Sequence, residues 1–244
     1  MLLKIDGLVI REQKVVDDRL ITILTRQKGL VRAYARSARK MKNPSPATQI
    51  LSFSSFVLYH SREKYIINES ETIELFFELR SDIEKLALAQ YFCELSLCLC
   101  PEEDDAEHYL RTVLNALHFL AKGSRPPLLL KSIVELRLLA LAGYLPDLTA
   151  CSKCGEYESE QTLFLYDEGK IMCKNCSNDS SGILLNKGAV TALRHIAYSE
   201  PDKLFSFTVS ENSAAQLNTA TENYTLCKTD RTFKSLDFYN SIKL

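Results

Sequence analysis

The sequence predicts an α+β protein of several domains: an N-terminal five-stranded β-barrel, then an α-helical domain with a four-cysteine module inserted into it. Three observations predict this arrangement. Short runs of β-forming residues fill roughly the first seventy positions, helical patterns with capping signals fill most of the remainder, and two Cys-x-x-Cys pairs lie between residues 151 and 176. With 244 residues, 46% of them hydrophobic, the chain is long enough for two or three domains.

Five stretches near the N-terminus are expected to be strands because they are rich in Val, Ile, Leu, Tyr and Phe and are separated by turn-forming residues. These stretches are residues 3–11, 19–25, 30–36, 50–59 and 64–70. Five short strands fit a small barrel, and the OB-fold is the five-stranded barrel that binds oligonucleotides. The strand count alone does not separate it from an SH3-like barrel. We assign residues 1–80 to this domain.

Helical patterns begin after the barrel. Ser81 and Glu84 form a capping box, which predicts a helix that Pro101 ends. Further helical stretches are expected at about 106–121, from Pro126 to Gly143, from near Asn186 and from near Ser210. Residues 81–147 and 182–244 are therefore assigned to two parts of one helical domain.

Two Cys-x-x-Cys pairs separated by 18 residues are the most specific motif in the chain. Cys151 with Cys154 and Cys173 with Cys176 can form a tetrahedral thiolate cage, which Zn²⁺ favours. A redox site is the alternative, but it needs one such pair in a βαβ context. Four thiolates leave no open position for catalysis, so we expect one structural zinc in a module spanning residues 148–181. The other cysteines, in apolar helical contexts, are expected to be buried: Cys93, Cys98, Cys100 and Cys227.

A basic stretch from residue 26 to residue 42 carries seven Lys or Arg and no acidic residue. Alternate residues of a strand share a face, so Arg32, Tyr34 and Arg36 are expected to point away from the barrel core. Basic groups flanking an aromatic ring are typical of sequence-tolerant binding to single strands. The alternative is a merely solvated face. The candidate nucleic-acid-binding residues are Arg26, Lys28, Arg32, Tyr34, Arg36, Arg39, Lys40 and Lys42.

The distribution of charge agrees with an anionic ligand for the first part of the chain only. Residues 1–67 carry 13 Lys or Arg against 5 Asp or Glu, a net charge of +8, whereas the whole chain has a net charge of −1. No signal peptide and no stretch long enough to span a bilayer is evident, so we expect a cytoplasmic protein. In that compartment eight cysteines are not expected to form a disulfide framework.

Motifs for catalysis are missing from the sequence. It contains no phosphate-binding glycine motif, no Gly-x-Ser-x-Gly and no His-Glu-x-x-His, and its four histidines are scattered. The acidic run at residues 102–105 is interpreted as a solvated turn. The sequence therefore favours a protein that is not an enzyme.

Several patches, taken in their order along the chain, resemble the bacterial DNA repair protein family RecO. The matching patches are 7–10 (GLVI), 18–25 (DRLITILT) with Gly29, 35–40 (ARSARK), 91–95 (YFCEL), 135–139 (ELRLL), 143–146 (GYLP) before the first cysteine pair, and 234–238 (KSLDF). The resemblance spans nearly the whole chain, and the order and spacing of the patches carry it.

The resemblance implies an OB-fold, a helical domain with an inserted zinc module and a recombination mediator of the bacterial nucleoid. Such a mediator binds single- and double-stranded DNA, anneals complementary strands and joins RecR to help load RecA onto DNA coated with single-strand-binding protein. The helical domain would hold the acidic C-terminal tail of the single-strand-binding protein, for which Arg125, Lys131 and Arg137 are plausible contacts.

Three other functions remain open from the residues alone. The first is a zinc-containing RNA-binding or ribosome-associated OB-fold protein, which competition between DNA and RNA of one sequence would reveal. The second is an adaptor whose basic face docks an acidic protein. The third is an enzyme with an unrecognised site.

Overall fold

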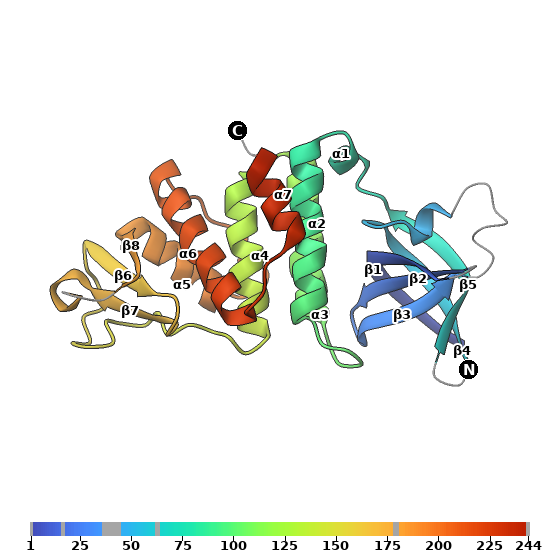
Figure 1. The fold of residues 1–244 in the computed structure, drawn as a ribbon, viewed down its shortest axis with the longest axis horizontal. Helices are drawn as coiled ribbons and strands as arrows, with labels where there is room; N and C mark the ends of the chain where they lie inside the picture. Colours follow the sequence, from blue (N-terminus) through green and yellow to red (C-terminus); the bar gives the residue numbers. More distant parts are fainter. Residues whose placement is uncertain (1, 16–17, 36–44, 62–63, 178–180, 243–244) are drawn as a thin grey trace. The chain divides into compact units, whose positions relative to one another are not determined.

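The computed structural model describes residues 2–15, 18–35, 45–61, 64–177 and 181–242. The chain forms two compact units: Met1–Lys122 with Phe233–Leu244, and Gly123–Thr232. Figure 1 shows the elements in order along the chain. The domain boundaries after residues 80, 147 and 181 stay a prediction. In the part of the chain that is described, no helix is both long enough and apolar enough to cross a membrane.

The first unit begins with a closed five-stranded barrel, as predicted. Its strands are β1 (Leu2–Val15), β2 (Asp18–Thr25), β3 (Gly29–Ala35), β4 (Phe53–Ser61) and β5 (Lys64–Glu74), with a short 3₁₀ turn η1 (Pro46–Thr48) before β4. The strand order is β1-β2-β3-β5-β4, and every pair is antiparallel except β3 with β5. The fourth strand starts later than residue 50 because residues 50 and 51 lie in a turn after η1.

Alternate residues of the strands fill the inside of the barrel. The buried core residues are Ile5, Val9, Ile21, Ile23, Val31, Ala33, Phe56 and Leu58. Gly7 is required where β1 crosses β2, because a Cβ there would lie 2.4 Å from Ile23 Cγ2 and 2.8 Å from the Leu24 carbonyl oxygen.

Four helices complete the first unit: α1 (Phe77–Arg80), α2 (Ile83–Leu99), α3 (Glu107–Lys122) and α7 (Lys234–Ile242). The predicted Ser81 cap is wrong. Ser81 has helical backbone angles at the end of α1 and donates its hydroxyl to the Glu78 carbonyl, whereas extended Asp82 accepts hydrogen bonds from the N–H groups of Glu84 and Lys85. An N-cap needs non-helical backbone angles, so the position falls to Asp82.

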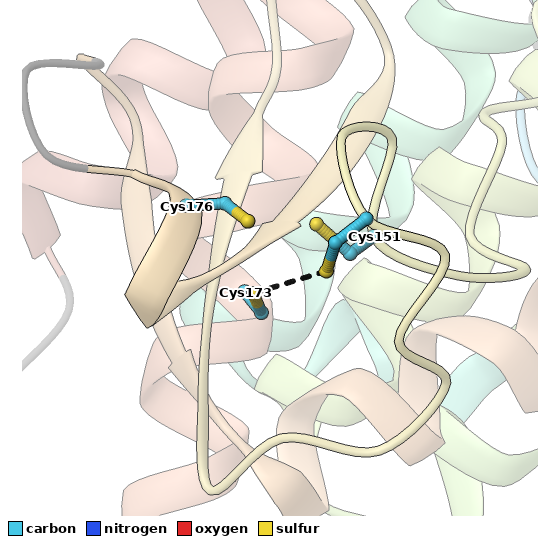
Figure 2. Close-up of side chains that lie close together, drawn as sticks. Cys151, Cys173 and Cys176 are labelled. Atoms are coloured by element: carbon cyan, nitrogen blue, oxygen red, sulfur yellow. Dashed lines mark hydrogen bonds between the residues drawn. The ribbon is translucent and has the colours of Figure 1, made fainter.

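The second unit combines three helices with a three-stranded sheet. The helices are α4 (Pro127–Leu141), α5 (Lys187–Tyr198) and α6 (Glu211–Thr229); the sheet has the order β7-β6-β8, from β6 (Gln161–Leu165), β7 (Lys170–Cys173) and β8 (Ile183–Asn186). β7 ends at Cys173, and the 3₁₀ turn η2 (Lys174–Cys176) follows it (Figure 2). The sheet packs on α6 through Phe164, whose ring centroid lies 5.5 Å from that of Tyr224.

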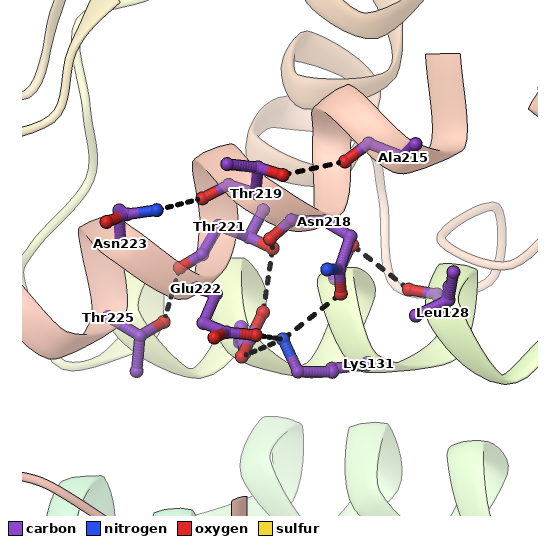
Figure 3. A network of polar contacts seen from close by, with 11 residues as sticks. Leu128, Lys131, Ala215, Asn218, Thr219, Thr221, Glu222, Asn223 and Thr225 are labelled. Carbon is purple, nitrogen blue, oxygen red and sulfur yellow. Dashed lines mark hydrogen bonds and ion pairs between the residues drawn. The ribbon is translucent and has the colours of Figure 1, made fainter. Parts of the chain in front are cut away.

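A buried ion-pair network joins α4 to α6 (Figure 3). The Lys131 ammonium is fully buried and lies 2.8 Å from carboxylate oxygens of both Glu135 and Glu222. It also donates a hydrogen bond to Asn218, and Thr221 donates one to Glu135 at 2.7 Å. One buried cation thus faces two carboxylates where α4 meets α6, and Asn218 and Thr221 add neutral hydrogen bonds.

We expect Lys131→Met to destabilise the second unit by about 3–5 kcal/mol, because Glu135 would keep a buried carboxylate without its cation. Urea unfolding followed by helical circular dichroism measures the change. Lys187→Met is the matched control, since it breaks only the exposed pair with Glu158 and should barely move the midpoint. Equal midpoints for the two variants would show that the buried network does not stabilise the fold.

Candidate metal centre and nucleic-acid interface

The structure brings the four predicted cysteines together. The sulfur atoms of Cys151, Cys154, Cys173 and Cys176 all lie within 4.8 Å of one another, and those of Cys154 and Cys173 are 3.7 Å apart. The first pair comes from the loop after α4 and the second from the end of β7 and η2 (Figure 2). Zn–S bonds of about 2.3 Å in a tetrahedron separate the sulfurs by roughly 3.8 Å. The set therefore fits one tetrahedral metal ion.

Backbone hydrogen bonds hold the first cysteine pair in a tight turn. The Gly155 N–H donates to the Cys151 carbonyl at 2.9 Å, and Gly155 has a φ of 78°, which a glycine adopts without strain. The Ser152 N–H donates to the Ile171 carbonyl at 2.9 Å. The turn is thereby fastened to β7, the strand that carries the second pair.

The thiols differ in how readily they ionise. Burial alone raises the pKa of Cys151, but the N–H groups of Cys173, Cys154 and Lys153 stabilise its thiolate and lower the pKa to about 6. Burial, together with hydrogen bonds to Glu156 and the other thiols, raises the pKa of Cys173. The Cys151 thiolate is thus ready to bind a cation, whereas a cation must displace the protons of Cys173 and Cys176, whose pKa values are raised.

Of the remaining cysteines, Cys93 and Cys100 are buried as expected, and burial raises the pKa of each to about 12. Cys98 is half-buried. The expectation of burial is wrong for Cys227, which is exposed near the end of α6.

Arg194 of α5 anchors the cysteine module, although sequence reasoning did not single it out. Its Nε donates to the Leu148 carbonyl at 2.7 Å, and its Nη2 donates to the carbonyls of Thr149 and Tyr157 at 3.1 and 2.8 Å. Its guanidinium also lies 4.2 Å from the centre of the Tyr157 ring. These contacts hold both sides of the first cysteine pair against α5. No local pattern marks Arg194, because its partners lie 37 to 46 residues earlier in the chain.

The predicted alternation of β3 is confirmed. Val31, Ala33 and Ala35 are buried, whereas Arg32 is exposed and Tyr34 is half-buried on the outer face of the barrel. Arg26 is exposed and Lys28 half-buried in the turn before β3. The candidates Arg36, Arg39, Lys40 and Lys42 lie outside the described residues.

Residues 100–106, the segment between α2 and α3, form hydrogen bonds with the turn that carries Arg26 and Lys28. We call this segment the clasp. The Glu103 N–H donates to the Lys28 carbonyl at 3.0 Å, and the Leu30 N–H donates to the Pro101 carbonyl at 2.9 Å. A Cβ at Gly29 would lie 2.0 Å from that same Pro101 oxygen. Only glycine therefore permits this close approach of the two chain segments.

The same segment places carboxylates beside two candidate basic residues. Arg32 Nη2 lies 2.5 Å from Glu102 Oε1, and Arg26 Nε lies 4.0 Å from Glu107 Oε1. The acidic run at residues 102–105 is exposed, as the interpretation of a solvated turn predicts, and Glu102 in addition reaches Arg32 on β3.

Lys64 is a basic residue that sequence reasoning missed. Its Nζ lies 5.4 Å from the centre of the Tyr34 ring. The parallel register of β3 and β5, in which Tyr34 is the partner of Ile66, brings it there. Lys64 lies outside the basic stretch, so only the strand register could have revealed it.

The three basic residues considered for an acidic tail are all engaged inside the second unit. Lys131 is fully buried, so the expectation that it contacts a tail is wrong. Arg125 donates to the Phe207 carbonyl at 2.8 Å, and Arg137 donates to the carbonyls of Ile196 and Ala197 at 3.4 Å.

We expect a bound metal ion to protect four of the eight cysteines from a thiol reagent in the native protein. Cys227 should react quickly, while the buried thiols of Cys93 and Cys100 stay inert. A chelator should then release the metal and expose Cys154 first, since it is the exposed member of the set. Thiol titration with and without chelator measures this, with Cys227→Ser removing the background. An unchanged thiol count after chelation would argue against a metal centre.

Comparison of the sequence with known protein families agrees with the resemblance noted above. A family model described as "Recombination protein O N terminal" matches residues 1–76, and one described as "Recombination protein O C terminal" matches residues 80–237.

Curated relatives match along the same length. The chain is 33% identical over 243 residues to the DNA repair protein RecO of Acetivibrio thermocellus, covering 98% of this chain and 97% of the relative. It is 32% identical over 248 residues to that of Symbiobacterium thermophilum, covering 99% and 98%. For that of Alkaliphilus metalliredigens the identity is 29% over 246 residues, covering 99% and 100%. The chain belongs to the RecO family of DNA repair and recombination proteins.

Proposed function

We propose that this protein is a recombination mediator that binds single- and double-stranded DNA, anneals complementary strands, and joins RecR to help load RecA onto DNA coated with single-strand-binding protein. Membership of the RecO family supports this proposal. The observation that carries it for this chain is the outer face of β3, where Arg32 and Tyr34 lie side by side with Lys64 over the Tyr34 ring.

The chemistry of this face suits a nucleic-acid strand. Arg32 and Arg26 offer guanidinium groups that phosphates can accept in pairs of hydrogen bonds, and Tyr34 offers a ring on which a base can stack. In the proposal, Arg36, Arg39, Lys40 and Lys42, which lie outside the described residues, supply further phosphate contacts. Two strands held on one basic surface repel each other less, which favours their annealing.

The metal in this proposal is a single structural Zn²⁺. Four thiolates at tetrahedral spacing are the donor set that Zn²⁺ favours, and they leave no open coordination position for water. Zinc would supply folding free energy to a module with only a small sheet of its own; in isolated zinc-finger peptides the apparent value is about 10–16 kcal/mol. The role proposed for the module is therefore structural, and the proposed function requires no catalytic group.

The clasp gives DNA binding a competing intramolecular contact. A phosphate that binds Arg32 must displace the Glu102 carboxylate, which already lies 2.5 Å from the guanidinium. Both side chains are more than half exposed, so the pair is weak and exchangeable. The protein would then prefer phosphate-dense strands over isolated anions.

We expect the protein to accelerate annealing of two complementary oligonucleotides coated with single-strand-binding protein, and salt to reduce the acceleration. Arg36→Ala/Arg39→Ala/Lys40→Ala should lose it and should lower the slope of log affinity against log salt by about 0.7 for each phosphate contact removed. The charge-matched control, Lys170→Ala/Lys174→Ala/Lys203→Ala in the second unit, should behave as the wild type. Absence of oligonucleotide binding at low salt would reject the proposal. Equal competition by RNA of the same sequence would favour an RNA-binding protein.

We also expect Glu102→Gln to tighten binding to single-stranded DNA by about two- to fivefold, because Arg32 is freed from its ion pair. Fluorescence anisotropy with a labelled oligonucleotide at low salt measures the affinity. Glu103→Gln makes the same change in charge one residue away and should have a smaller effect. If both variants bind equally, the gain comes from the general field and not from release of Arg32.

A further inference from the structure

An apolar row crosses the outer wall of the barrel from strand to strand. The register pairs Leu2 with Tyr59, Tyr59 with Ile66, Ile66 with Tyr34, and Tyr34 with Leu20. Directly paired residues of neighbouring strands place their side chains on the same face of the sheet. We call these five residues the outer row.

The outer row points away from the barrel core. The chain neighbours of its members, among them Ile21, Ala33 and Leu58, belong to the core or pack against it, and successive side chains of a strand point to opposite faces. Leu2 is 62% exposed and Tyr59 is 47% exposed, while the other three members are half-buried. The solvated face of an antiparallel sheet is normally polar, so a continuous apolar row needs an explanation.

Two aromatic rings lie at regular positions in the outer row. Tyr34 on β3 and Tyr59 on β4 are separated by β5, which contributes Ile66 between them. Strands in a sheet lie about 4.8 Å apart, so the two tyrosines are roughly 10 Å apart at their backbones. Ring, aliphatic surface and ring thus follow one another across three strands.

Basic side chains flank the outer row. Lys64 lies over the Tyr34 ring, with its Nζ 5.4 Å from the ring centre. Lys4 is exposed on the same face of β1, two residues beyond Leu2, and Arg32 lies two residues before Tyr34 on β3. The same face also carries acids. Asp6 lies two residues beyond Lys4, Asp18 lies two residues before Leu20, and Glu69 is the register partner of Val57 next to Lys4. Glu102 pairs with Arg32. Alternating rings and cations match a strand whose bases are free to stack.

We propose that a single strand of nucleic acid crosses the barrel wall along the outer row, with Tyr59 as a second base-stacking platform beside Tyr34. This inference rests on the proposed function and adds the path of the strand. Bases of a duplex are stacked on each other and cannot reach the two rings. The outer row therefore favours single strands over duplexes, whereas the basic groups bind the phosphates of both.

We expect Tyr59→Ala to weaken binding of a labelled oligothymidylate about tenfold, while Tyr59→Phe, which keeps the ring, binds nearly as the wild type. Duplex affinity and the salt slope should not change in Tyr59→Ala, whereas Lys64→Gln should lower the slope by about 0.7. Tyr144→Ala is the matched control, because Tyr144 has a similar exposure of 43% but lies in the second unit. A merely structural effect of Tyr59→Ala would weaken single-strand and duplex binding alike.

A second readout does not depend on loss of affinity. The chain contains no tryptophan, so Tyr59→Trp introduces a single indole into the outer row. Oligothymidylate should quench the emission of this indole on binding, and it should leave Tyr144→Trp unchanged. Stacking of a base on residue 59 is the contact that this signal reports.

The outcomes separate the path of the strand from the proposed function. If the wild type binds no oligonucleotide at low salt, both are rejected. If the wild type binds, but Tyr59→Ala binds equally well and Tyr59→Trp is not quenched, the outer row is not the path while DNA binding stands. If Tyr59→Ala instead changes only the mass measured by sedimentation over a concentration series, the outer row is an interface between copies of the chain.

Discussion

The parallel contact between β3 and β5 determines where the candidate nucleic-acid contacts lie. It consists of two register pairs, Ala33 with Tyr65 and Tyr34 with Ile66, and it closes the barrel. A closed barrel has no unpaired strand edges, which in an open sheet invite pairing with other chains. The same contact brings Lys64 over Tyr34 and makes the outer row continuous. The contact that closes the barrel is therefore the same contact that assembles the candidate binding face.

The charge on this face is balanced locally, not merely over the whole chain. The net charge of −1 is the sum of a basic N-terminal part and an acidic remainder. Two carboxylates of the remainder, Glu102 and Glu107, lie beside Arg32 and Arg26. The close approach at Gly29 sets where the backbone places Glu102, while the exposed side-chain pair itself stays exchangeable. The candidate binding face is therefore partly neutralised by carboxylates of its own chain.

Features set by local sequence could be predicted, whereas features set by long-range register could not. Strand alternation in β3 and the grouping of the four cysteines could be predicted from the sequence, because residue period and spacing are local properties. The partners of Lys131 and Arg194 lie between 37 and 91 residues away, apart from Glu135, so no pattern announced that Lys131 is buried or that Arg194 anchors the module. The predicted Ser81 cap was wrong because the capping-box pattern does not take the preceding helix α1 into account. Ser81 ends α1 with helical backbone angles, so it cannot be the N-cap of α2.

The cysteine module illustrates how a small element can be kept rigid without a large core. Its loop between the cysteine pairs, residues 156–172, carries five acidic residues and one lysine, which is a poor surface for phosphates. Its contacts are instead internal: Ser152 to Ile171 across the two pairs, and Arg194 to the backbone on both sides of the first pair. A metal ion held by the four cysteines would tie the chain that follows α4 to the end of β7. This arrangement supports the structural role proposed for the module.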